Sequence, residues 1–243
     1  MTDEPLAWLV SLEGVSSAFA AARDGIDVML RDRGLRRTTP DTTGESLLRG
    51  AHASAVLEGS TSTLAEVRDG TGDQIATDAV RLSVELLPLV PVLKRAPLQA
   101  FARLHAVAAA AGSLPAEELG RPRGPQEVAR LRSLADLLAA DRTTPALILA
   151  AVVHADLASV APFGSHNGIV ARAAERLVLV ARGVDPTSLV VPEAGHLALR
   201  EQYESNLRGY ASGQRSGMHS WLLYAAEAFT AGAEASPLRR DAA

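Results

Sequence analysis

The chain has 243 residues and no cysteine, which excludes disulfides, thiolate metal sites and a cysteine nucleophile. Hydrophobic residues make up 47% and charged residues 21% of the sequence, as in a globular protein with a buried core. The formal charge is −4 and Lys94 is the only lysine, so we expect no basic face for nucleic acid. No apolar run reaches the roughly 18 residues that span a bilayer, and the start MTDEP is acidic where a signal peptide is basic. We therefore expect a cytoplasmic protein without a membrane partner.

Helical periodicity dominates the sequence. Aromatic residues make up only 4%, and Ala, Leu, Arg and Glu recur at spacings of three and four, which predicts an all-α fold. Prolines near helix starts and glycines after helix ends mark the boundaries. In chain order, the predicted helices are 15–33, 43–58, 63–68, 71–86, 97–111, 125–139, 144–160, 168–182, 192–211 and 216–235.

The predicted helices group into one domain with flanking segments. We expect residues 1–44 to form an N-terminal helical extension, residues 45–235 to form the domain, and residues 236–243 to be a tail. Two segments, 35–43 and 112–125, are loop-like, and the second is rich in glycine and proline. Either could border a site.

The stretch VAPFGSHNGIVAR, residues 160–172, has the features of an anion-binding helix start. Asn167 can cap the following helix, and Gly168 lets a ligand approach the backbone closely. Free N–H groups and the helix dipole favour an anion there, and Arg172, one turn further on, can meet the same anion. The residues alone favour a capped helix start that binds nothing.

The same stretch resembles the core motif of the Fic (Fido) family, His-Pro-Phe-x-Asp/Glu-Gly-Asn-Gly-Arg-x-x-Arg. The matching residues are Pro162, Phe163, Asn167, Gly168 and Arg172. His154 precedes the motif much as a histidine often does in that family.

A second motif lies upstream of the first. Ser54-x-x-x-Glu58-Gly59 resembles the family's inhibitory motif, Ser/Thr-x-x-x-Glu-Gly/Asn, and the closing segment up to Trp221 is similar to the family's last helices. The resemblance covers about residues 45–235 and implies a Fic-like helical bundle. It assigns Ser54, Glu58 and Gly59 to an inhibitory helix that acts on the second motif arginine, here Arg172.

Fic proteins usually transfer AMP from ATP to a protein hydroxyl, and this chain departs from the motif where that chemistry is performed. The position of the histidine base is Ala161, that of the Mg²⁺-binding acid is Ser165, and that of the first arginine is Ile169. His166 replaces the glycine before the motif's asparagine. Losing a general base removes about 10² to 10⁴ in rate, and Mg²⁺ prefers carboxylate ligands. We therefore assign no catalytic residue and predict a pseudoenzyme.

Two sets of side chains could replace the lost base or metal ligand. His166 is the weak candidate for a displaced base, although no carboxylate stands beside it to hold a metal. His154 and Asp156 are two residues apart on a helix and do not share a face, while His196 and His219 are scattered along the chain. We interpret His154 as a packing residue and assign no metal site.

Three functions remain open. The first is binding, either of ATP, another nucleotide or another phosphate at Asn167, Gly168 and Arg172, or of a protein partner. The second is Fic-type nucleotidyl transfer with altered catalytic residues. The third is a purely structural role. No cofactor is assigned, Mg²⁺ lacks its carboxylate, and the sequence does not decide whether the chain forms a homodimer.

Glu58 and Arg172 form either a gate that a phosphate opens or an ion pair that fastens the helix to the core, and we favour the fastening role. The prolines of 112–125 disfavour the strand with which the family aligns its targets.

Overall fold

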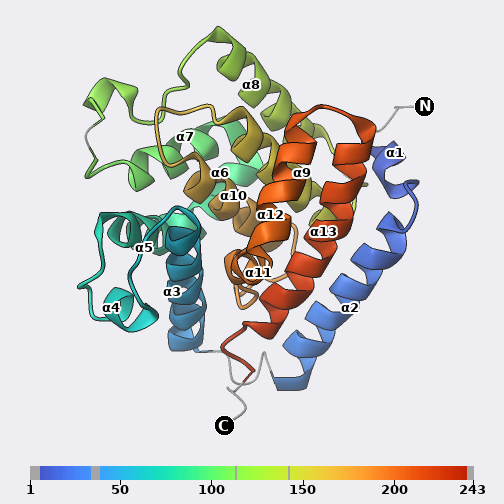
Figure 1. Cartoon of the computed structure of the whole chain (residues 1–243), viewed down its shortest axis with the longest axis horizontal. Coiled ribbons are helices and arrows are strands. Elements are labelled where there is room, and N and C mark those ends of the chain that lie inside the picture. The colour runs from blue at the N-terminus through green and yellow to red at the C-terminus, as the bar shows by residue number, and fades with distance from the viewer. Residues whose placement is uncertain (1–5, 34–38, 113, 142, 240–243) are drawn as a thin grey trace.

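The computed structural model describes residues 6–33, 39–112, 114–141 and 143–239. Every regular element among them is a helix, so the predicted all-α fold is confirmed (Figure 1). The first half of the chain contains α1 (Ala7–Val10), α2 (Val15–Arg33), α3 (Pro40–Leu57), α4 (Leu64–Arg68), α5 (Gln74–Leu86), the 3₁₀ helix η1 (Leu87–Leu89), α6 (Val90–Arg95) and α7 (Pro97–Ala108). The second half contains the 3₁₀ helix η2 (Ala116–Glu118), α8 (Pro125–Ala140), α9 (Ala146–Val160), α10 (Asn167–Ala181), α11 (Pro192–Ala198), α12 (Arg200–Ala211) and α13 (Arg215–Glu234).

The structure contains two short elements that were not predicted, α1 and η2, and differs from the predicted elements in three further places. The helix predicted over 192–211 is two helices, α11 and α12, which meet at Leu199 with φ −111° and ψ 37°. Residues 87–95, for which no helix was predicted, form η1 and α6, and the prolines of both lie in the first turn, where a proline is tolerated. The predicted loop 35–43 lies partly outside the described residues, and from Pro40 onward it is helical because Thr39 caps α3 through the Thr42 N–H.

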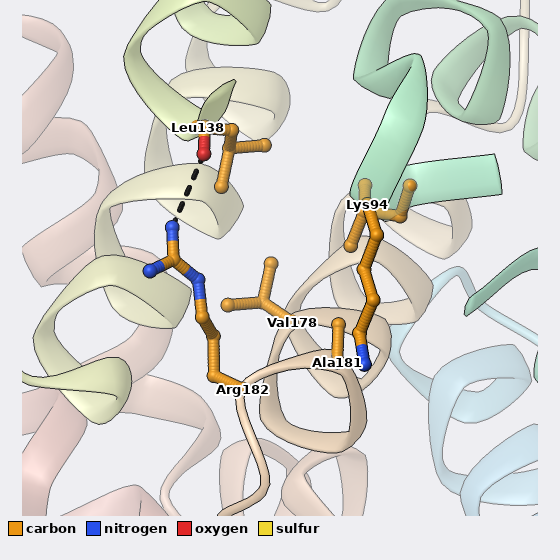
Figure 2. Close-up of a pocket in the computed structure, with 6 residues that line it drawn as sticks. Lys94, Leu138, Val178, Ala181 and Arg182 are labelled. Carbon is orange, nitrogen blue, oxygen red and sulfur yellow. Dashed lines mark hydrogen bonds between the residues drawn. The ribbon is translucent and has the colours of Figure 1, made fainter. Parts of the chain in front are cut away.

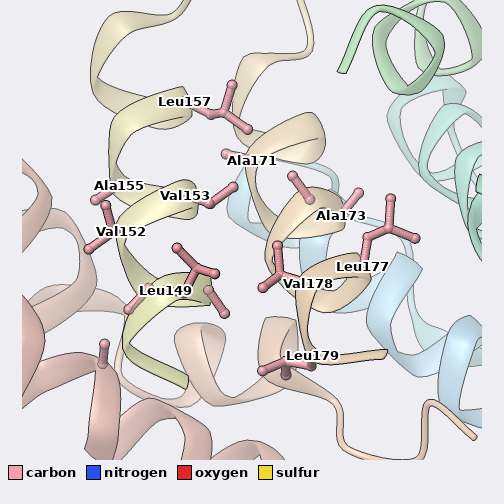
Figure 3. Packing of buried hydrophobic residues seen from close by; sticks show 14 of the residues in the cluster. Leu149, Val152, Val153, Ala155, Leu157, Ala171, Ala173, Leu177, Val178 and Leu179 are labelled. Carbon is pink, nitrogen blue, oxygen red and sulfur yellow. The ribbon is translucent and has the colours of Figure 1, made fainter. Parts of the chain in front are cut away.

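The centre of the molecule is the pair α9 and α10, which pack side by side (Figure 3). Their apolar side chains meet between the two helices, among them Leu149 and Val153 of α9 and Val178 of α10. Every residue of α9 from Leu147 to Leu157 is buried, so the helix is apolar almost all round, as a central helix must be. This central pair carries the motif loop between its two helices.

The N-terminal helices contribute to the same core. α2 runs along α13 (Figure 1), where the rings of Phe19 and Phe229 lie 6.3 Å apart. α3 packs against α5 and α11 and brings its C-terminal end to the start of α10. The division of the chain at residue 45 stays a prediction, and that position lies inside α3. In the part of the chain that the structure describes, no helix is both long and apolar enough to cross a membrane.

Candidate functional site

The motif loop joins α9 to α10 through two left-handed residues. Ala161 has φ 44° and ψ 60° at the end of α9, and His166 has φ 57° and ψ 17° before α10. Such backbone costs a non-glycine residue about 1 kcal/mol or more. The side chain of Asn167 accepts a hydrogen bond from the N–H of Phe163 and donates one to its carbonyl, both at 2.9 Å. The predicted capping role of Asn167 is therefore wrong: Asn167 is the first residue of α10, and its amide closes the loop.

The loop is anchored by the segment that precedes α8. The buried ring of Phe163 stacks on His105 of α7 with the centroids 4.3 Å apart. His105 accepts a hydrogen bond from the Gly120 N–H through Nδ1, and burial lowers its pKa to about 4. The Arg123 N–H donates to the carbonyl of Pro162 at 2.9 Å. Segment 112–125 thus borders the motif loop through backbone contacts.

Glu58 lies at the place where an anion would meet the start of α10. Its Oε1 is 2.7 Å from Nη2 of Arg172. It also lies so close to Gly168 that a Cβ at that position would overlap the carboxylate. A negative charge at a helix N-terminus is favourable, so the Glu58 carboxylate lies where the start of α10 favours an anion.

Arg172 is buried and makes several hydrogen bonds besides the ion pair. Its Nε donates to Ser54 Oγ at 2.9 Å, Nη2 to the Ser54 carbonyl at 3.1 Å, and Nη1 to Tyr203 Oη at 3.2 Å. Burial opposes its charge, but Tyr203 and Glu58 raise the pKa of Arg172 above its usual value. Only 1% of the Arg172 side chain is exposed, against 32% for Glu58, so solvent reaches this pair from the glutamate side.

At the positions that differ from the Fic motif, the residues present do not replace the missing base, acid or arginine. Ala161 offers only a methyl group, and Ile169 is buried in the hydrophobic core. Ser165 does not stand alone, however, because its Oγ lies 2.6 Å from Nδ1 of His166.

A carboxylate far along the chain completes this contact. Nε2 of His166 lies 3.1 Å from Oδ2 of Asp78 on α5, and Asp78 is itself held by Arg81 at 2.6 Å and Gln74 at 2.8 Å. The expectation that no carboxylate stands beside His166 is therefore wrong. Ser165, His166 and Asp78 form a serine–histidine–aspartate chain, in which the carboxylate orients the imidazole and the imidazole can accept the hydroxyl proton. Asp78 could have been noticed in the sequence as an acid on the otherwise apolar face of its helix.

A second polar group lies in the core behind Arg172. His154 of α9, Glu175 of α10 and His196 of α11, which we call the histidine–glutamate cluster, are fully buried. Oε2 of Glu175 is 3.1 Å from Nδ1 of His154 and 2.8 Å from Nε2 of His196. The outer nitrogen of each imidazole meets a tyrosine hydroxyl: Tyr203 at 3.1 Å from His154, and Tyr224 at 2.7 Å from His196. His154 is thus more than a packing residue, and it comes together with His196.

Burial and mutual attraction set the charges in this cluster. Burial lowers the pKa of His154 to about 4, so this imidazole is neutral at pH 7. Burial would raise the pKa of Glu175, but its contacts with His154 and His196 lower that pKa below its usual range. Glu175 and His154 therefore titrate as a coupled pair.

The other candidates from the sequence lie elsewhere. His219 contacts the Glu13 carbonyl at 2.7 Å, and Asp156 pairs with Arg130 at 2.5 Å. Neither joins the histidine–glutamate cluster.

A pocket lies near the opposite end of α10 from the motif loop (Figure 2). It has a volume of about 270 Å³, and Lys94 and Arg182 flank it. Arg182 donates to the carbonyls of Leu138 and Asp141 at 3.1 and 3.0 Å, so it interacts with the C-terminal end of α8. These contacts give Arg182 a structural role.

Comparison with known proteins relates the fold to one family. No family model and no curated protein matches the sequence. Among solved structures, a Fic family protein from Desulfovibrio desulfuricans G20 aligns with a TM-score of 0.70 at 17% identity, over 89% of this chain and 73% of that chain. Fic-1 from C. elegans, residues 134–508, aligns with a TM-score of 0.70 at 18% identity, over 93% of this chain and 72% of that chain.

These alignments confirm the fold that the motifs implied. The chain is an all-α protein with the fold of Fic family proteins. At this level of identity the similarity establishes the fold, and the function must be argued from the residues of the site.

Proposed function

We propose that the protein is a catalytically degenerate Fic-like protein that binds an anion, in the first instance a nucleotide phosphate, at Gly168 and Arg172, and does not transfer AMP. One observation carries the proposal: the Glu58 carboxylate lies on Arg172 and against Gly168. A site that already accepts a carboxylate there has the charge and shape to accept a phosphate oxygen.

The exposure of the two partners supports exchange of one anion for another. Glu58 is half-buried at the end of α3, and the following Gly59 has φ 97°, which gives the chain a turn at that point. If Glu58 moves away, Arg172 keeps its bonds to Ser54 and Tyr203 and stays oriented. The guanidinium would then present Nη2 to the ligand.

The lost residues argue against AMP transfer by the family's route. Ala161 cannot take the proton of a target hydroxyl, and the hydroxyl of Ser165 is a poor anchor for Mg²⁺. Binding should therefore be independent of Mg²⁺. A protein partner on the helical surface is compatible with this anion site.

Calorimetric titration tests the proposal. Wild type, Glu58→Ala and the control Glu45→Ala, which removes a carboxylate from the same helix, are titrated with ATP, ADP, AMP and inorganic phosphate, each with and without Mg²⁺. We expect Glu58→Ala to bind one of these ligands at least about tenfold more tightly than wild type, a difference of about 1.4 kcal/mol. The gain should be independent of Mg²⁺. No binding by any variant would leave the structural role, and Mg²⁺-dependent binding with transfer of labelled AMP would establish an enzyme.

The serine–histidine–aspartate chain favours a second candidate, an enzyme with altered residues. In it, Ser165 Oγ attacks a phosphorus of bound ATP and His166 takes the hydroxyl proton. Attack on the α-phosphorus releases pyrophosphate and leaves a nucleotidyl group on Ser165, and attack on the γ-phosphorus releases ADP and leaves a phosphoryl group. Asp78 would orient His166. Intact-mass analysis after incubation with ATP and Mg²⁺ tests this candidate. An adduct that Ser165→Ala abolishes and Asp78→Asn reduces would support it, and an unchanged mass would exclude it.

A further inference from the structure

The histidine–glutamate cluster has the arrangement of a metal site. Nδ1 of His154, an oxygen of Glu175 and Nε2 of His196 all lie within 4.8 Å of one another. The three side chains come from α9, α10 and α11, and none of them is exposed to solvent. Charged or polar groups at this depth require partners for every donor and acceptor.

Two of the polar atoms in the cluster lack such a partner. Oε1 of Glu175 is buried without a hydrogen bond. Nδ1 of His154 is close to Glu175 Oε2, but it is not aligned for a hydrogen bond with it. A buried polar group without a partner destabilises the fold, and a charged one does so more strongly. A cation between these atoms would satisfy both.

The tyrosines provide the outer contacts that a metal-binding histidine normally has. Tyr203 meets the nitrogen of His154 that faces away from Glu175, and Tyr224 does the same for His196. A hydroxyl that accepts a hydrogen bond from the outer N–H holds the imidazole with the lone pair of its inner nitrogen directed at the metal. Hydrogen bonds of this kind orient both rings toward one point.

We infer that His154, Glu175 and His196 bind a single divalent ion of the Zn²⁺ type. Two imidazoles and a carboxylate suit Zn²⁺, Co²⁺ or Ni²⁺ better than Mg²⁺ or Ca²⁺, which prefer oxygen ligands. Tetrahedral Zn²⁺ with ligands at about 2.0–2.1 Å holds them roughly 3.4 Å apart. The contacts of 2.8 and 3.1 Å to Glu175 would therefore have to widen by about 0.6 and 0.3 Å. The second oxygen of Glu175 can complete a distorted four-coordinate shell if the carboxylate binds the ion through both oxygens.

The site is structural. Its ligands are fully buried, so no substrate reaches the ion, and a closed shell of protein ligands is typical of ions that stabilise a fold. The ion would join α9, α10 and α11, which carry its three ligands. The site lies next to Arg172, because Tyr203 contacts both His154 and Arg172.

Metal analysis of the untagged, full-length chain tests the inference. The protein is purified without chelators, its zinc is measured by mass spectrometry, and the metal-free chain is then titrated with Co²⁺ and Zn²⁺. We expect one zinc per chain and, with Co²⁺, the visible absorption of a four-coordinate ion. Glu175→Gln and His196→Gln should lower the affinity at least about 100-fold. The matched control, His105→Gln, removes a buried imidazole outside the cluster and should leave the affinity within about twofold.

A milder variant keeps the test decisive if a ligand variant does not fold. Tyr224→Phe removes only the outer hydrogen bond of His196 and should lower the metal affinity about 10- to 100-fold. A metal-free chain that takes up neither Co²⁺ nor Zn²⁺ would overturn the inference, as would unchanged affinity in all cluster variants. The cluster would then be a hydrogen-bonded carboxylate–imidazole network.

Discussion

The contribution of Glu58 to stability can be predicted from its contact with Arg172. Glu58→Gln keeps the shape of the side chain and removes the charge that lies 2.7 Å from the guanidinium. Exposed ion pairs contribute about 0.2–1 kcal/mol, whereas breaking a buried pair costs about 3–5 kcal/mol. This pair is intermediate, because Arg172 is buried and Glu58 is one-third exposed, and Ser54 and Tyr203 still accept hydrogen bonds from Arg172. We expect a loss of about 1–2 kcal/mol.

Thermal denaturation followed by circular dichroism measures this loss. In a chain of this size, 1 kcal/mol lowers Tm by about 2–4 °C, so Glu58→Gln should melt about 2–8 °C below wild type. The control is Glu45→Gln on the same helix, whose partners Arg49 and Arg68 are more exposed than Arg172, and it should cost no more than about 1 kcal/mol. If Glu58→Gln melts together with the control, the pair does not fasten α3 to α10. Robust transfer of labelled AMP by Glu58→Gly would refute the loss of catalysis itself.

Other predictions concern acid stability, helix packing and the motif loop. Burial lowers the pKa of His105 from 6.5 to about 4, so neutral His105 stabilises the fold fully above pH 6.5, and up to about 3 kcal/mol of this stability is lost as the pH falls toward 4. In urea denaturation, the free energy of unfolding of His105→Gln should therefore depend less on pH over that range. An equal pH dependence in wild type and variant would contradict this. A Cβ at Gly217 would overlap the Gly209 backbone, so Gly217→Ala should lower Tm by several degrees. At Gly44, which lies in a helix, a Cβ would enter open space, so Gly44→Ala should raise the free energy of unfolding by about 0.5–1 kcal/mol. Asn167→Ala removes two hydrogen bonds of the motif loop and should cost about 1–3 kcal/mol in chemical denaturation; a neutral result would show that the loop holds without them.

The helices could be predicted largely from the sequence because local signals determine them. The bounds of α2 agree with the prediction, and most other helices agree within a few residues, since periodicity and terminal prolines and glycines act locally. α6 was not predicted, although its proline lies in the first turn, where a proline is compatible with a helix. The break at Leu199 depends on tertiary packing: Gly195 lets α11 approach the Ala228 carbonyl of α13 too closely for a Cβ.

The candidate site was predicted only in part, because its contacts join distant segments. The motifs led to Glu58 and Arg172 through a resemblance, whereas periodicity alone gave no reason to pair them. Asp78 and Glu175 are acids on buried helix faces, which indicates that a partner exists without identifying it. The identity of that partner follows only from how α5, α9, α10 and α11 pack.

The buried charged residues of α10 indicate which ligands this fold could bind. Arg172, Glu175 and Arg176 lie on one central helix, all buried, and each is paired with a different part of the chain. Arg176, for example, meets Glu193 of α11 at 2.6 Å. Buried charges are costly, and apolar replacements of similar size are often neutral or stabilising, so stability alone gives weak grounds for keeping three of them. The motif positions of the base, the acid and the first arginine, by contrast, are apolar or neutral here. The proposed ligands, an anion for Arg172 and a cation for Glu175, would account for two of the three buried charges, and Glu193 pairs with the third, Arg176.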